Sequence, residues 1–187
     1  MPDPYKRLSD SAQRSALLIF FLLTVTLLTG MHALDQSLIT DAAPSGIVSF
    51  ELAGNIQQAK QILEEWGPKG RGYAALSLGL DYLFLIVYAL FLSLACILVA
   101  RHLAPRIAFL AMGGVVLGWG QFFAALLDAI ENLALINIIL DSQRGIWPII
   151  ARWCAIVKFG IVGAGLVYIL IGTLFVLALK GFAFIKR

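Results

Sequence analysis

Four long apolar runs, separated by polar connectors, dominate this sequence. They cover residues 15–34, 73–100, 106–140 and 152–179. A helix of about 20 apolar residues is long enough to cross the hydrocarbon core of a bilayer. With 60% hydrophobic and 13% charged residues, the chain of 187 residues is also too apolar for a soluble domain of this size. We therefore expect an all-α fold in the lipid bilayer, a single domain in which four spanning helices form a bundle.

The basic residues lie near the ends of the runs and predict an orientation. Eight of them are expected on the side of the two termini: Lys6, Arg7, Arg14, Arg101, Arg106, Lys180, Lys186 and Arg187. Five share the opposite side with six acids, which are Asp35, Asp41, Glu51, Glu64, Glu65 and Asp141. Because cytoplasmic segments are enriched in Lys and Arg, both termini are predicted to be cytoplasmic. Basic residues placed in this way, without interleaved aromatic residues, do not indicate nucleic-acid binding.

Four charged residues, Asp81, Asp128, Glu131 and Lys158, interrupt three of the apolar runs. A charge at the bilayer centre costs about 3 kcal/mol or more, so each of them must be paired, hydrated or functional. Counting about 20 residues from the basic end of each run reaches the level of these charges in all three helices. We therefore expect Asp81, Asp128 and Lys158 at one height in the bundle, with Glu131 one turn further out.

Other polar residues share helix faces with these charges, because they follow them at spacings of four, seven or ten residues. The candidate site residues are Asp81, Asp128, Glu131, Asn132, Lys158, Gln121, Tyr88 and Tyr168. From the charged plane, a polar seam is expected to run inward past Tyr88, Gln121 and Tyr168. No cofactor is implied by any motif. Metal chemistry is only weakly supported: oxygen ligands alone would suit a hard cation such as Mg²⁺ or Ca²⁺, and a zinc or di-iron site is not expected, because neither His32 nor His102 lies at this level.

Three acids and one lysine leave a formal charge of about minus two in a partly desolvated place. One carboxyl group can stay protonated, a cation can bind, or water can hydrate the cluster. The first functional hypothesis is a site for a small cation, an amine or a lipid headgroup. The second is an accessory or scaffolding subunit, in which the cluster fixes helix packing and glycine-lined faces dock a membrane-protein partner or a second copy. The third is an intramembrane enzyme acting on lipid or isoprenoid substrates, which requires an apolar cavity beside a carboxyl group.

The first long connector predicts a fifth, amphipathic helix outside the membrane, over residues 50–66. Its apolar stripe consists of Leu52, Ile56, Ala59, Leu63 and Trp66, at the spacing of one helical face. Ser49 is a candidate N-cap, and Gly67 with Pro68 ends the helix. The helix would pack as a lid on the outer end of the bundle, or lie flat among the lipid headgroups.

Several stretches resemble a group of small bacterial four-span membrane proteins to which no activity is assigned. They are ILEEWGPKGRG at 62–72, LDYLFLIVYAL at 80–90, GQFFAALLDAIENLAL at 120–135 and VKFGIVGAGLVY at 157–168. The resemblance covers about two thirds of the chain and includes the acidic and lysine positions. It implies a multi-pass protein of the bacterial inner membrane, and it implies no reaction.

Overall fold

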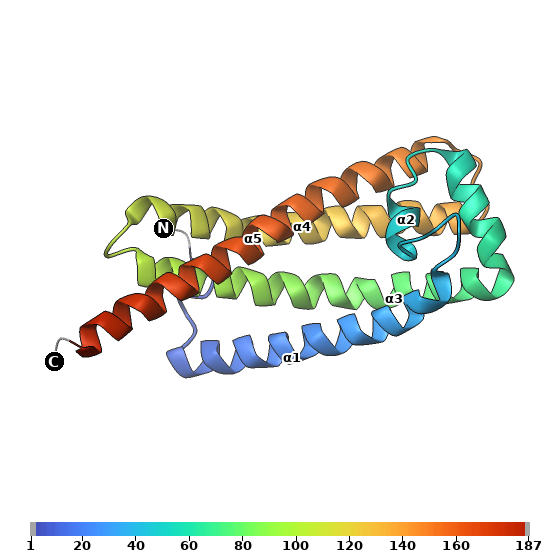
Figure 1. Cartoon of the computed structure of the whole chain (residues 1–187). Helices are drawn as coiled ribbons and strands as arrows, with labels where there is room; N and C mark the ends of the chain where they lie inside the picture. The colour runs from blue at the N-terminus through green and yellow to red at the C-terminus, as the bar shows by residue number, and fades with distance from the viewer. Residues whose placement is uncertain (1–2, 186–187) are drawn as a thin grey trace.

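Residues 3–185 are described by the computed structural model, with side chains up to residue 178, and they form a bundle of helices (Figure 1). The helices are α1 (Asp10–Asp35), η1 (Gln36–Leu38), α2 (Ile47–Glu51), α3 (Ile56–Leu103), α4 (Ala108–Ile139) and α5 (Ile146–Ile185). Four of them, α1, α3, α4 and α5, are long and apolar enough to cross a membrane. The predicted all-α class with four such helices is confirmed. Of the basic residues used to predict the orientation, Lys186, Arg187 and the side chain of Lys180 lie outside the described part.

Helix α3 is the centre of the bundle, because it packs against α1, α4 and α5. Helix α4 also packs along α5, whereas α1 lies on the outside, mainly against α3 (Figure 1). Side chains of α1 such as Leu18 and Leu22 are more than half exposed in the isolated chain. In a bilayer such side chains face lipid, where apolar exposure carries no penalty.

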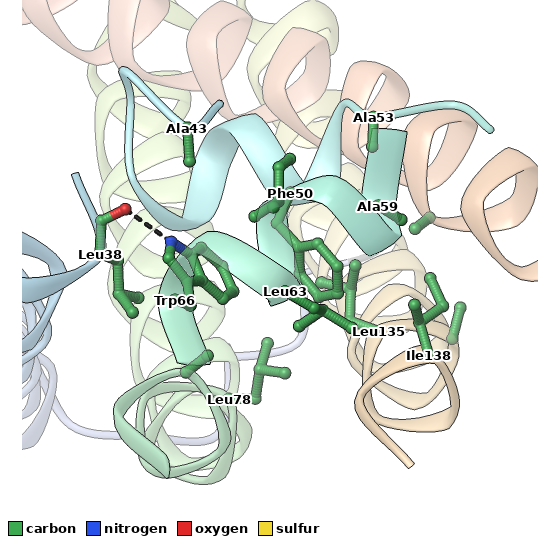
Figure 2. Close-up of a cluster of buried hydrophobic side chains, with 14 residues drawn as sticks. Leu38, Ala43, Phe50, Ala53, Ala59, Leu63, Trp66, Leu78, Leu135 and Ile138 are labelled. Carbon is green, nitrogen blue, oxygen red and sulfur yellow. Dashed lines mark hydrogen bonds between the residues drawn. The ribbon is translucent and has the colours of Figure 1, made fainter. Parts of the chain in front are cut away.

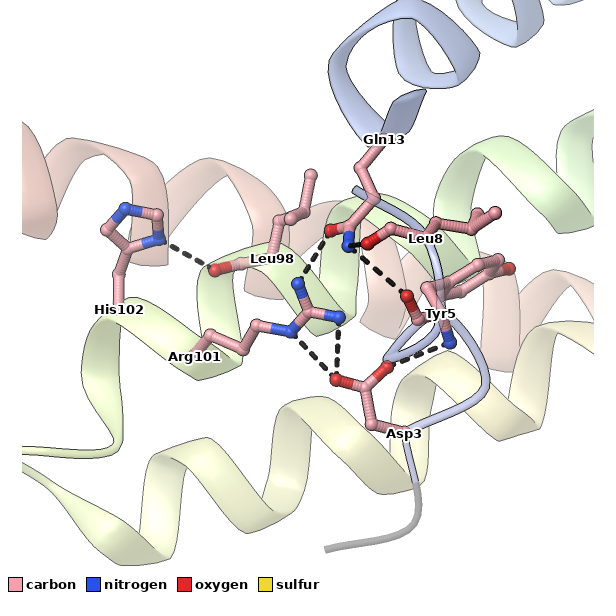
Figure 3. A network of polar contacts seen from close by, with 7 residues as sticks. All are labelled: Asp3, Tyr5, Leu8, Gln13, Leu98, Arg101 and His102. Atoms are coloured by element: carbon pink, nitrogen blue, oxygen red, sulfur yellow. Dashed lines mark hydrogen bonds and ion pairs between the residues drawn. The ribbon is translucent and has the colours of Figure 1, made fainter. Parts of the chain in front are cut away.

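One end of the bundle is closed by a polar network around Arg101 (Figure 3). Its guanidinium donates from Nε and Nη2 to Asp3 Oδ2, with both distances at 2.7 Å, and from Nη1 to Gln13 Oε1 at 2.6 Å. The Gln13 amide donates in turn to the carbonyl oxygens of Tyr5 and Leu8. These bonds tie the segment before α1 to the last turns of α3. We call this the N-terminal end of the bundle, and the opposite end the connector end.

At the connector end, α3 bends sharply at Gly67. This residue has φ of 58° and ψ of −170°, a non-helical conformation that glycine adopts without steric cost, and Pro68 follows it. Residues 56–66 therefore turn away from the axis of α3 and lie across the end of the other helices (Figure 1). The sequence GP was predicted to end a helix here, and the kink is its structural effect.

The predicted helix over 50–66 is wrong in its bounds. Glu51 ends α2, Gly54 has φ of 74°, and the side chain of Asn55 caps the next helix by accepting from the backbone N–H of Gln58 at 2.8 Å. The helical segment thus begins at Ile56. The sequence contains two capping signals in a short stretch, and the one at Asn55 is used in place of Ser49.

An apolar cluster packs residues 56–66 onto the bundle (Figure 2). Trp66 lies against Phe50 with ring centroids 5.2 Å apart, and its indole N–H donates to the Leu38 carbonyl at 2.7 Å. Leu135 and Ile138 of α4 belong to the same cluster. The connector 36–55 and the first part of α3 are therefore held against the ends of the long helices by a common core.

Replacing Trp66 tests how much this core contributes to stability. Trp66→Ala removes a buried ring and leaves the Leu38 carbonyl without its donor, so we expect a loss of about 3–5 kcal/mol. Thermal unfolding in a mild detergent measures the change. Trp153→Ala is the matched control, because Trp153 is 62% exposed. Equal melting temperatures for the two variants would contradict the packing described here.

Candidate functional site

The charged residues of three long helices meet inside the bundle. Asp81 comes from α3, Asp128 and Glu131 from α4, and Lys158 from α5, and all four are buried. On α4 the acids are three residues apart and thus share one face of the helix. The prediction that these side chains come together is confirmed.

Lys158 is the hub of the cluster. Its ammonium group donates to Asp128 Oδ1 at 2.5 Å and to Glu131 Oε1 at 3.0 Å. The second oxygen of Asp128 accepts a hydrogen bond from the Tyr88 hydroxyl at 3.1 Å. One cation therefore joins two carboxylates of α4 to α5, and Tyr88 adds a bond from α3.

Asp81 has a different partner. Its Oδ2 accepts from the Asn132 amide at 2.6 Å. Among the residues whose side chains are described, no Lys or Arg forms an ion pair with Asp81. Asp81 is thus a buried carboxyl group held by a neutral donor, without a counter-charge.

Two predicted site residues lie away from the ion pairs. The Gln121 amide donates to the carbonyl oxygens of Leu117 at 3.2 Å and Ile161 at 3.4 Å. The Tyr168 hydroxyl lies against Gly114, where an added Cβ would come within 2.1 Å of it. Both residues are further along the bundle, toward the N-terminal end, as the predicted seam requires.

Sequence reasoning missed Glu51, which it had counted with the acids outside the membrane. Glu51 ends the short helix α2, is 8% exposed, and lies next to Glu131. A signal for it exists in the sequence, since Glu51 is the one acid in the apolar stretch 46–54. An acid in such a stretch is expected to be buried and paired.

Local geometry brings Glu51 to this place. Asp35 Oδ1, at the end of α1, accepts from the Ile47 N–H at 2.7 Å and so anchors the start of α2. Gly46 precedes it with φ of 54°, and a Cβ on Gly46 would come within 2.1 Å of the Asp35 carboxylate. Two constraints therefore require glycine at position 46: the positive φ of its backbone and the lack of space for a side chain.

Burial raises the pKa of Glu51 above its usual value. The positive charge of Lys158 lowers this pKa in part, and the Asp128 carboxylate raises it. Glu51 Oε2 and Glu131 Oε2 are both buried without a hydrogen-bond partner among the residues whose side chains are described. We expect one proton to be held between the two carboxyl groups, because a protonated acid can donate to a carboxylate. Four carboxyl groups, one such proton and one ammonium leave the cluster with a formal charge of minus two.

A cavity of about 420 Å³ reaches this cluster. Glu51, Asp81, Asp128 and Lys158 line its polar part, together with Ser77, Tyr88, His32 and Asp35. Its apolar walls come from α1, α2, α3 and α5, and consist of Leu28, Met31, Ile47, Val48, Phe84, Phe91, Leu92, Phe159, Val162 and Leu166. Lys158 is paired directly with carboxylates, as a purely structural network would be, but the cluster is not sealed in a packed core. A volume of this size lies in the range of small-molecule sites.

The proton between Glu51 and Glu131 predicts a pH dependence of stability. A carboxyl group whose pKa is raised on folding binds more protons in the folded state, so stability falls as pH rises above the unfolded pKa of 4.5. For one group the slope is at most about 1.4 kcal/mol per pH unit. Glu51→Gln retains a donor that can face Glu131 and removes the titration, so its melting temperature should fall less between pH 5 and 8 than that of the native protein.

Glu64→Gln is the matched control, because this glutamate lies on the exposed side of the same end of the molecule. It should retain the native slope. A Glu51→Gln variant with an unchanged slope would show that the carboxyl pair holds no such proton.

Comparison of the chain with protein-family models, with curated protein sequences and with solved structures finds no match. The buried cluster and its cavity are therefore the features of the molecule that bear on its function.

Proposed function

We propose that this protein binds an amphiphile in the membrane, a molecule with a cationic amine head and an apolar tail. The head would lie beside Asp81, and the tail would occupy the apolar part of the cavity. The observation that carries the proposal is the lining of the cavity. Carboxyl groups line one part of it, and aliphatic and aromatic side chains line the rest. It refines the sequence-based hypothesis of a small cation, amine or lipid headgroup.

The sign of the charge favours a cationic head. With Lys158 shared by Asp128 and Glu131, the cluster still has an excess of negative charge, and Asp81 has only a neutral donor. An ammonium group beside Asp81 would supply the missing counter-charge. A phosphate or carboxylate head would add a further negative charge to a buried acidic site, which costs free energy.

The apolar walls favour a ligand with a tail. A small inorganic cation needs oxygen ligands on several sides, and apolar side chains such as Leu28, Phe91 and Val162 cannot supply them. Burying a tail against them contributes about 0.8 kcal/mol for each methylene group. The same cavity is also what an enzyme acting on lipids requires, so that hypothesis is the alternative to binding alone.

Binding of tritiated dodecylamine to the purified protein in a neutral detergent tests the proposal. We expect saturable binding that excess dodecylamine displaces and excess dodecanol does not, because the alcohol lacks the charge. Asp81→Asn should weaken binding about tenfold or more, since a charge-assisted hydrogen bond contributes about 1.5–3 kcal/mol. Asp41→Asn, at an exposed position, should leave binding unchanged.

A second pair of variants tests the place of the tail. Val162→Trp would fill part of the cavity and should abolish dodecylamine binding, whereas Val116→Trp, at a site 65% exposed and outside the cavity, should not. Displacement by dodecanol as effective as by dodecylamine would overturn the proposed role of charge. Equal binding by the two Trp variants would overturn the assignment of the cavity.

We propose that the protein lies in the bacterial inner membrane with both termini in the cytoplasm. The excess of basic residues on the side of the termini supports this orientation. In that orientation the connector 36–55 and the cluster lie toward the outer leaflet. We also propose kinship with small bacterial four-span membrane proteins. Docking of a membrane-protein partner on glycine-lined helix faces is the alternative proposal for the function.

Reporter fusions test this orientation. Alkaline phosphatase, which is active only outside the cytoplasm, should be inactive when fused after Arg187 and active when inserted in the connector at Asp41. A green fluorescent protein fusion should give the opposite pattern. Phosphatase activity at the C-terminus would overturn the orientation.

A further inference from the structure

Six buried side-chain oxygens have no hydrogen-bond partner among the residues whose side chains are described. They belong to Glu51, Glu131, Gln121, Tyr168, Ser93 and Tyr5. Buried polar atoms are nearly always hydrogen-bonded to protein or to water, and each exception requires an explanation. Two of the six lie in the acidic cluster, and the other four belong to residues between that cluster and the N-terminal end.

These groups follow one another along the bundle. The Tyr88 hydroxyl donates to Asp128, and its ring belongs to the same apolar cluster as Ala125, which is one turn from Gln121 on α4. Gln121 lies seven residues from Asp128, about 10 Å along the helix axis. The line of polar groups thus leaves the acidic cluster through Tyr88 and continues toward the N-terminal end at Gln121.

Two glycines make room for the next members of the line. A Cβ at Gly165 of α5 would come within 2.5 Å of the Gln121 amide nitrogen, and one at Gly114 of α4 would come within 2.1 Å of the Tyr168 hydroxyl. A larger residue at either position would displace the polar group. The α4–α5 interface is therefore shaped around polar side chains at two successive levels.

The line ends at the N-terminal segment. The Cys96 thiol lies 3.9 Å from the Gly165 carbonyl oxygen, one turn along α3 from Ser93. The Tyr5 hydroxyl faces Ser93, and the Tyr5 carbonyl accepts from Gln13 in the network of Arg101. Polar side chains from α3, α4, α5 and the N-terminal segment thus lie between the cluster and the N-terminal end.

We propose that this line is a proton path, in which bridging waters connect the acidic cluster with the N-terminal end of the bundle. Buried waters form about three hydrogen bonds each, to groups such as these unpartnered oxygens. At each hydroxyl or water, one proton arrives and another leaves, so charge moves without a net change in any group. The proton shared by Glu51 and Glu131 would be exchanged with the N-terminal side along this path.

The inference predicts proton conduction by the protein alone, so its test uses no amphiphile and is independent of amine binding. Purified protein is reconstituted in vesicles of neutral lipid that contain a pH-sensitive dye, and a potassium gradient with valinomycin drives proton uptake. The native protein should acidify the vesicles at a rate several times that of protein-free vesicles. A rate equal to that of protein-free vesicles would overturn the proposal.

Variants at adjacent glycines test the route. Gly114→Ala places a methyl group where the Tyr168 hydroxyl lies and should reduce the proton flux at least tenfold, whereas Gly113→Ala points into open space and should retain it. Tyr168→Phe removes the hydroxyl with almost no change in volume, and should also reduce the flux if Gly114→Ala fails to fold. Native flux in a folded Tyr168→Phe or Gly114→Ala protein would overturn the route.

Discussion

The ion pairs of Lys158 with Asp128 and Glu131 are the interaction on which the interior of this protein depends. Between helices in a membrane there is little hydrophobic driving force, so close packing and interhelical hydrogen bonds decide how they associate. The two bonds at 2.5 and 3.0 Å set the register of α5 against α4. Breaking a buried pair by removing one partner typically costs about 3–5 kcal/mol, because the remaining charge stays buried. The same pairs leave Asp81 without a cation and so give the cavity its acidic character.

The connector between α1 and α3 contributes both to the acidic cluster and to the apolar core at the connector end. Its short helix α2 delivers Glu51 to the cluster, while its other side chains fill the core around Phe50 and Trp66. An element outside the long helices thus supplies one of the four carboxyl groups of the site. Changes in the packing of this connector would alter the charge of the cavity directly.

Much of the fold and part of the site could be predicted from the sequence. The four apolar runs predict the long helices because run length and bilayer thickness are directly related. The meeting of Asp81, Asp128 and Lys158 followed from counting residues along helices of known rise, which fixes height but not neighbours. The contact between Asn132 and Asp81 depends on helix rotation and side-chain reach, so spacing could place the two residues in the same candidate set but could not pair them.

Other features lay beyond what periodicity reveals. Ser49 and Asn55 are both good helix caps, and the choice between them depends on the backbone conformation of Gly54. Glu51 was missed because its burial results from tertiary contacts of a five-residue helix, which has too few residues for a periodic pattern. The cavity is a property of how α1 and α5 pack on α3, and no local pattern encodes the space between two helices.

The position of Lys158 on the last long helix has a consequence for how the protein is made. Synthesis proceeds from the N-terminus, so Asp128 and Glu131 leave the ribosome before Lys158, the cation with which they pair, exists. During that interval these carboxyl groups can enter the lipid only as neutral acids or with water around them. Arrival of α5 then allows ionisation, so the buried charges of the mature site form at the last step of membrane insertion.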